Sequence, residues 1–117
     1  MREKRKFFRF ESPVELRYAA EGGDIEGRSR TENISREGAA FPIEKRLAKN
    51  EALKMEFEIP GDNVPVFANG VVAWARKGKT CRKELFDVGV RFVSISRPDR
   101  ARILDYVYNN WVKKFLR

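Results

Sequence analysis

Residues 53–59 read LKMEFEI, a run in which apolar and charged side chains alternate at every step. Successive side chains of an extended strand point to opposite faces, so the apolar side chains share one face and the charged ones share the other. This pattern is typical of a β-strand that covers a core on one side and meets water on the other. The turn-forming sequence PGDN at 60–63 follows directly and ends the predicted strand.

Similar runs on both sides of this strand extend the prediction to a sheet of six strands. Alternation predicts strands at 14–18 and 86–92, and a more polar strand at 25–31. The short segment 38–41 is expected to stop at Pro42, because proline cannot donate to a sheet ladder. Residues 64–76 supply the strand after the PGDN turn, and Gly70 inside it predicts a bulge or a bend.

The end of the chain changes period and predicts a helix over about residues 97–116. Ser96 is the expected N-cap, and Asp99 stands where it can close a capping box. Apolar side chains then recur at helical spacing, and the predicted buried face consists of Leu104, Val107, Tyr108, Trp111 and Phe115. Trp111 and Phe115 fit packing on the sheet, and they also fit a surface that docks another protein or a second copy of the chain.

Six short strands followed by one helix indicate a fold dominated by β-structure, either a small antiparallel barrel or a sandwich, with the helix packed on it. The chain has 117 residues, which is enough for one domain and too few for two of ordinary size. The domain is expected to cover 13–117. Residues 1–12 interleave aromatic and basic side chains without strand alternation, and they are expected to form a flexible basic arm.

Composition narrows the class of function. The chain holds 25 Lys and Arg against 17 Asp and Glu, a net charge of +8 that favours anionic partners. It holds no histidine and one cysteine, Cys81, so the commonest general base, an internal disulfide and a thiolate metal site are excluded. We therefore expect neither enzymatic activity nor a metal or cofactor. No apolar run resembles a signal peptide or a membrane span, and together with the free cysteine this predicts a cytoplasmic protein.

Two polar motifs stand outside the strand pattern. Arg5 and Arg9 form an R-x-x-x-R pair, and residues 33–38 read NISREG. Guanidinium forks bind phosphate bidentately and also bind the O6/N7 edge of guanine. Asn33 and Ser35 point the same way from an extended chain, so their amide and hydroxyl can bind one ligand together. Gly38 allows either a positive φ or a close approach of the backbone to a ligand. The motifs together predict a site for a small, flat, anionic ligand.

This order of motifs, R-x-x-x-R and then [D/N]-x-S-x-x-G, resembles the pattern of the PilZ domain, a bacterial receptor for the second messenger cyclic di-GMP. Each motif alone is common, but the strands and the helix that follow extend the resemblance over nearly the whole chain. The resemblance implies a six-stranded antiparallel β-barrel of the split-barrel type with a C-terminal helix packed on it. It also implies that Arg5 and Arg9 make phosphate and base contacts, and that Asn33, Ser35 and Gly38 complete the site. Many members have Asp at position 33, so Asn33 implies somewhat weaker binding.

Four further residues are implied as additional ligand contacts, each with a plainer alternative. Trp74 and Arg76 occupy positions that extend the ligand surface by stacking in some members, although a rim Trp and a solvated Arg explain them equally well. Lys4 stands where a basic residue favours two stacked ligand molecules over one. Arg36 lies inside the second motif and is either a phosphate contact or simply exposed.

The resemblance therefore predicts a non-enzymatic receptor in which cyclic di-GMP orders the N-terminal arm and changes the surface that a downstream protein meets. It implies pathways such as motility, biofilm formation or secretion. One alternative is a nucleic-acid-binding barrel that stacks bases on Phe7, Phe8, Phe10 and Trp74. The strands show no regular basic stripe, which disfavours nucleic acid. The other alternative is an interaction module without a ligand, although such members usually lack the arginine pair that this chain keeps.

Overall fold

The computed structural model of the chain describes residues 11–23, 25–78 and 85–115. The predicted N-terminal arm, apart from its last two residues, and Cys81 lie outside this part. The described residues form one antiparallel sheet in the order β2-β1-β5-β6-β7-β4-β3, followed by one helix. The elements are β1 (Glu15–Ala20), β2 (Glu26–Arg30), β3 (Asn33–Ile34), β4 (Gly38–Ile43), β5 (Ala52–Glu58), β6 (Val66–Lys77), β7 (Phe86–Ile95) and α1 (Arg97–Phe115).

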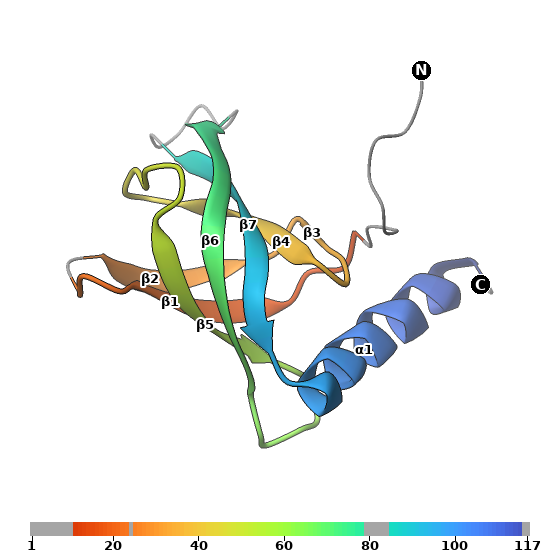
Figure 1. Cartoon of the computed structure of the whole chain (residues 1–117). Coiled ribbons are helices and arrows are strands. Elements are labelled where there is room, and N and C mark those ends of the chain that lie inside the picture. Colours follow the sequence, from red (N-terminus) through yellow and green to blue (C-terminus); the bar gives the residue numbers. More distant parts are fainter. Residues whose placement is uncertain (1–10, 24, 79–84, 116–117) are drawn as a thin grey trace.

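The sheet curls into a barrel-like shape, and the helix lies at one end of it (Figure 1). The curl brings β2, the strand at one edge, close to β4 near the other edge, where the Ser29 hydroxyl donates a hydrogen bond to the Pro42 carbonyl. This bond bridges the seam between β2 and β4. The predicted fold class, a curled antiparallel β-structure with a C-terminal helix, is therefore confirmed.

The predicted number of strands is wrong by one. Asn33 and Ile34, which the sequence assigned to a turn, form the two-residue strand β3 opposite Ala40 and Ala39 of β4. A strand of two residues is too short to show alternation, so no sequence pattern marks it.

Pro42 does not stop β4, which continues to Ile43. Residues 40 and 42 direct their backbone polar groups to the same side of the strand. On that side the Ala40 carbonyl accepts a hydrogen bond from the N–H of Glu32, whereas Pro42 lies beyond the end of β3 and uses its carbonyl for Ser29. Because Pro42 stands at an edge, its missing N–H costs the sheet no ladder bond.

The core follows the predicted alternation. Leu53, Met55 and Phe57 of β5 are buried, and Lys54 and Glu58 between and after them are exposed. The predicted irregularity at Gly70 is also confirmed, because the register of β6 against β7 shifts between Asn69 and Gly70. A Cβ atom at Gly70 would lie 2.6 Å from the Arg91 carbonyl oxygen, so this bulge admits only glycine without rearrangement.

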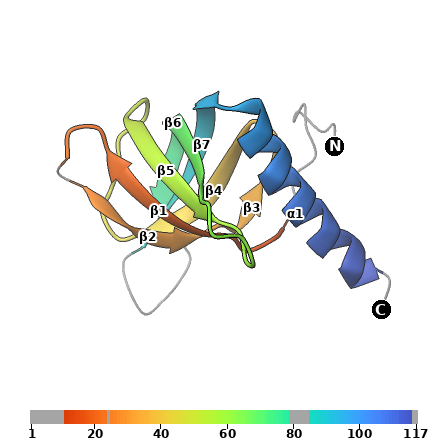
Figure 2. The same ribbon diagram turned by 90° about the horizontal axis from the view of Figure 1, so that it is seen from below.

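The helix begins as predicted at Arg97, where the Asp99 N–H donates a 3.2 Å hydrogen bond to Ser96 Oγ. Its buried face differs from the prediction, because Ile103 and Val107 are fully buried while Tyr108 is 53% exposed. Tyr108 directly follows the fully buried Val107, so its exposure comes from its position around the helix axis. Figure 2 shows that α1 meets the barrel along its first half and that its second half extends beyond the strands.

Arg102 fixes the start of the helix to the turn between β5 and β6. Its guanidinium binds the carboxylates of Asp99 and Asp62 at 3.0 and 2.7 Å and donates to the Val64 carbonyl. Among the described residues, no helix has both the length and the apolar character needed to cross a membrane.

Candidate functional site

The second motif forms a tight turn between β3 and β4. The Ser35 N–H donates to the Gly38 carbonyl at 2.8 Å, and the Glu37 N–H donates to Ser35 Oγ at 3.3 Å. The Ser35 side chain is buried, so its hydroxyl first stabilises the turn. It keeps its proton and a second lone pair for another partner.

Gly38 is required by the sheet itself. A Cβ atom at this position would lie 2.2 Å from the carbonyl oxygen of Val90 on β7, far inside van der Waals contact. Of the two alternatives for Gly38, the positive φ is not the one found, because the described glycines with positive φ are Gly23 and Gly61. The missing side chain at Gly38 therefore permits close approach of β7, and β4 and β7 can pair through the motif.

The strand register builds a flat outer surface next to this turn. Asn33 pairs with Ala40, Ala40 pairs with Gly89, and Gly89 pairs with Trp74, so the four residues form one row across β3, β4, β7 and β6. Directly paired residues lie on the same face of a sheet. Asn33 and Trp74 thus flank a floor of two small residues, and Trp74 covers Gly89 with its indole ring.

A cavity of about 180 Å³ lies over this floor. It is lined by Asn33, Ser35, Glu37, Gly38, Ala39, Ala40, Ala73, Trp74, Gly89, Val90 and Arg91. Pockets that enclose drug-sized ligands measure roughly 300–1,000 Å³. The described residues can therefore enclose only part of a larger ligand, and the remainder must meet solvent or another segment.

Arg76 stands at the rim of this surface. Its guanidinium lies 5.0 Å from the centre of the Trp74 ring, which is cation–π distance. Across the ladder it faces Asp87 of β7, which is hydrogen-bonded to Glu32. Burial, then the hydrogen bond with Asp87 and the charge of Asp87, raise the pKa of Glu32, while Arg76 opposes the shift. Arg76 thus lies between an aromatic ring and two carboxyl groups.

The structure brings together Asn33, Ser35, Gly38 and Trp74 of the predicted site and places Arg76 beside them. Arg36 lies in the exposed part of the turn and is not among the cavity-lining residues. Lys4, Arg5 and Arg9 lie outside the described residues.

Several residues of this surface were missed by the sequence reasoning. Ala40, Gly89 and Arg91 reach the site only through the pairing of β4 with β7, which no local pattern reveals. Gly89 carried a signal, since a glycine inside an alternating strand often marks close approach of another group. Arg91 carried none, because an exposed arginine on a strand is ordinary.

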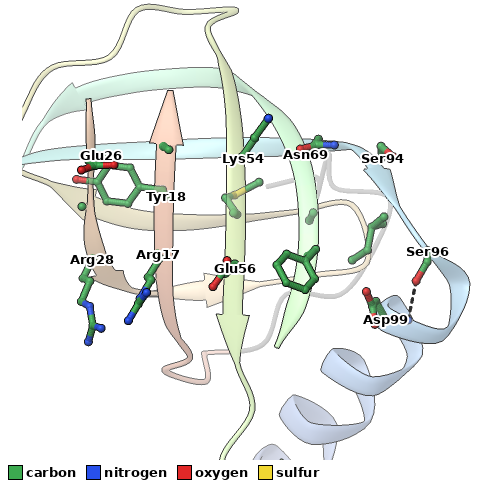
Figure 3. Close-up of a pocket in the computed structure, with 16 residues that line it drawn as sticks. Arg17, Tyr18, Glu26, Arg28, Lys54, Glu56, Asn69, Ser94, Ser96 and Asp99 are labelled. Carbon is green, nitrogen blue, oxygen red and sulfur yellow. Dashed lines mark hydrogen bonds between the residues drawn. The ribbon is translucent and has the colours of Figure 1, made fainter. Parts of the chain in front are cut away.

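A larger cavity of about 1,010 Å³ lies elsewhere on the outer face, over β2, β1, β5, β6, the end of β7 and the start of α1 (Figure 3). Its lining is electrically balanced: three cations, Arg17, Arg28 and Lys54, accompany three carboxylates, Glu26, Glu56 and Asp99. It contains none of the predicted site residues. Within the described ranges, no group of three His, Cys, Asp or Glu side chains is placed to hold a metal ion.

The comparisons with known proteins agree with this geometry. The model of the PilZ domain matches residues 3–109, so the chain belongs to the PilZ domain family. The predicted family is thereby confirmed. The comparison with curated proteins gave no match.

Several solved structures share the fold. The motility inhibitor MotI/DgrA of Bacillus subtilis superposes with a TM-score of 0.76 at 19% identity, covering 97% of this chain and 54% of that one. This chain thus spans about half the length of that protein. The PilZ domain of YcgR from Escherichia coli with c-di-GMP has a TM-score of 0.70 at 14% identity, and the coverage is 96% and 94%. The MrkH–c-di-GMP complex of K. pneumonia also has a TM-score of 0.70 at 14% identity, with coverage of 97% and 55%.

Proposed function

We propose that this PilZ domain is a receptor for cyclic di-GMP and that the ligand binds over the row from Asn33 to Trp74. The observation that carries the proposal is this row, where an amide and an indole flank a floor of alanine and glycine. A flat base needs such a floor, because any larger side chain at Ala40 or Gly89 would lift it from the sheet. Membership in the PilZ family and the c-di-GMP complexes of YcgR and MrkH support the choice of ligand.

Each residue of the row has a role that its chemistry allows. The amide oxygen of Asn33 accepts hydrogen bonds from guanine N–H groups, and the Ser35 hydroxyl donates to a base or a phosphate. Trp74 offers an aromatic face, and Arg76 stacks beside it. Arg36, on the adjoining turn, is expected to meet a phosphate.

The small volume of the cavity supports a role for the N-terminal arginines. A cavity of about 180 Å³ leaves much of a cyclic dinucleotide uncovered, so other groups must bind its phosphates and second base. Arg5 and Arg9 have the right chemistry, because a guanidinium fork binds both phosphate and guanine. Ordering of the arm on ligand binding then changes the surface offered to a downstream protein. Lys4 is expected to favour two stacked ligand molecules.

The proposed receptor works by binding and catalyses no reaction. It needs no metal, it acts in the cytoplasm, and its output is an altered contact with a partner protein. MotI/DgrA is an inhibitor of motility, which makes control of movement the first pathway to test.

Isothermal titration of the chain with cyclic di-GMP tests the proposal and reports affinity and stoichiometry together. We expect saturable binding that weakens by about 1–3 kcal/mol in Arg9→Ala and by about 1 kcal/mol in Asn33→Ala. A single-stranded oligonucleotide serves as the competing ligand. If the chain binds the oligonucleotide in a salt-sensitive manner and does not bind cyclic di-GMP, it is a nucleic-acid-binding barrel and the receptor proposal is wrong.

A further inference from the structure

Arg91 is the only Lys or Arg among the described residues that line the cavity over the motif. Its Cα pairs directly with Gly38 across β4 and β7, and a Cβ atom on Gly38 would lie 3.3 Å from it. The next residue, Phe92, donates its N–H to the Glu37 carbonyl at 2.7 Å, which fixes the turn to this point of β7. The backbone of Arg91 is thus held rigidly beside the motif.

The side chain of Arg91 is available for a ligand. It is exposed, and within the described part of the chain it forms no hydrogen bond or ion pair. Arg30 on β2, also exposed, contrasts with it, because its guanidinium binds the Glu15 carboxylate. Glu37 is the one carboxylate of the described cavity lining, so the charge of Arg91 is not surrounded by acidic groups.

Asn33 and Arg91 border the small-residue floor on two different sides: Asn33 lies beside Ala40, and Arg91 lies two residues along β7 from Gly89, in the row of Gly38. Asn33 is on β3 and Arg91 is on β7, with β4 between them. Two strand spacings separate their backbones by about 10 Å across the sheet. A planar base lying on Ala40 and Gly89 would therefore present one edge to the Asn33 amide and another edge to the Arg91 guanidinium.

The hydrogen-bonding polarity of these two ends selects a base. The Asn33 amide oxygen accepts, whereas the Arg91 guanidinium only donates. Guanine matches this pair, because it carries N–H donors on its Watson–Crick edge and the acceptors O6 and N7 on its other edge. Adenine places the donor N6–H₂ beside N7, so a guanidinium there would face a donor.

We propose that Arg91 is a specificity-determining residue of this site, which binds the O6/N7 edge of a guanine whose other edge meets Asn33. The inference rests on the proposed function and adds to it the reason for discrimination between guanine and adenine. It assigns the discrimination to a residue of the barrel wall, outside both sequence motifs.

The test compares cyclic di-GMP with cyclic di-AMP, which shares the phosphates and sugars but carries adenine. Titrations use the full chain, Arg91→Ala, Arg91→Lys and the control Arg17→Ala, which removes the same charge from an exposed position on β1. We expect Arg91→Ala to lower the affinity for cyclic di-GMP roughly 5- to 150-fold, the range for one bidentate arginine–guanine contact. The preference over cyclic di-AMP should shrink by the same factor. Arg91→Lys keeps the positive charge but lacks the bidentate guanidinium group, so it should lose most of the preference for cyclic di-GMP over cyclic di-AMP.

Two outcomes overturn this inference while leaving the receptor intact. One is that Arg91→Ala weakens both dinucleotides equally, as a general electrostatic effect would. The other is that Arg91→Lys, with a melting temperature like that of the parent chain, keeps the full preference for guanine. Absence of cyclic di-GMP binding by the parent chain would instead remove the proposed function, and the role of Arg91 with it.

Discussion

A Cβ atom built on Gly89 would lie 2.2 Å from Nε1 of Trp74, so the indole ring of β6 lies directly against the backbone of β7. The ring is not held by a pocket of large side chains. It fits there because Gly89 has no side chain. Because Trp74 also lines the cavity and stacks with Arg76, a substitution at Gly89 changes the ligand surface by moving the Trp74 ring.

Gly89→Ala should therefore displace the Trp74 ring. The added methyl overlaps three ring atoms, and we expect the free energy of unfolding to fall by about 1–3 kcal/mol, as for other overpacked sites. Tryptophan emission, measured in a Trp111→Phe background so that Trp74 alone reports, should shift in the absence of ligand. Gly22→Ala is the matched control, since a Cβ there meets nothing within 4 Å. Identical emission of the two variants would show that the ring is not seated on Gly89.

Gly38→Ala should destabilise the fold before it affects any ligand. Its Cβ would meet a backbone carbonyl, Val90 O, which cannot rotate away, so we expect a loss of about 3 kcal/mol or more in urea unfolding. A binding defect in this variant would then report on the pairing of β4 with β7. If Gly38→Ala unfolds at the same urea concentration as the parent chain yet binds no ligand, the glycine serves the ligand directly.

The carboxyl pair of Glu32 and Asp87 predicts a pH dependence of stability. Burial and the neighbouring Asp87 raise the pKa of Glu32 above its ordinary value of 4.5, so the folded state binds this proton more tightly than the unfolded state does. Its contribution to stability is therefore fully present below the ordinary pKa and is lost as the pH rises through the raised value. Glu32→Gln should be more stable than the parent chain at neutral pH, and the difference should disappear in acid. Urea unfolding over a pH series measures it, and a constant difference at all pH values would contradict the shift.

The packing of α1 on the barrel should depend on Ile103 and not on residues of the exposed side of the helix. Ile103 is 1% exposed, so Ile103→Ala should lower the free energy of unfolding by about 2–4 kcal/mol. Asp105→Ala, two residues away on the exposed side, is the control and should change stability by less than about 0.5 kcal/mol. Equal effects of the two substitutions in thermal or urea unfolding would mean that the helix does not pack on the barrel through this face.

The sequence predicted the elements well and their juxtaposition poorly. The run at 53–59 identified β5 because alternation is a local property, and Ser96 identified the start of α1 for the same reason. The row that joins Asn33 to Trp74 through Ala40 and Gly89 depends on the strand order β3-β4-β7-β6, which is a property of the whole sheet. The predicted helix face included Tyr108 and left out Ile103, because apolar residues at helical spacing do not settle which side of a helix meets the barrel.

The bond between the Ser29 hydroxyl and the Pro42 carbonyl has a consequence for how the molecule opens. Elsewhere the sheet neighbours are joined by ladders of amide hydrogen bonds, whereas β2 and β4 are joined here through one hydroxyl. β2 and β4 can therefore separate without the loss of a ladder of backbone hydrogen bonds between them. Exchange of amide hydrogens with deuterium should accordingly begin along β2, while the centre of the sheet at β6 and β7 stays protected.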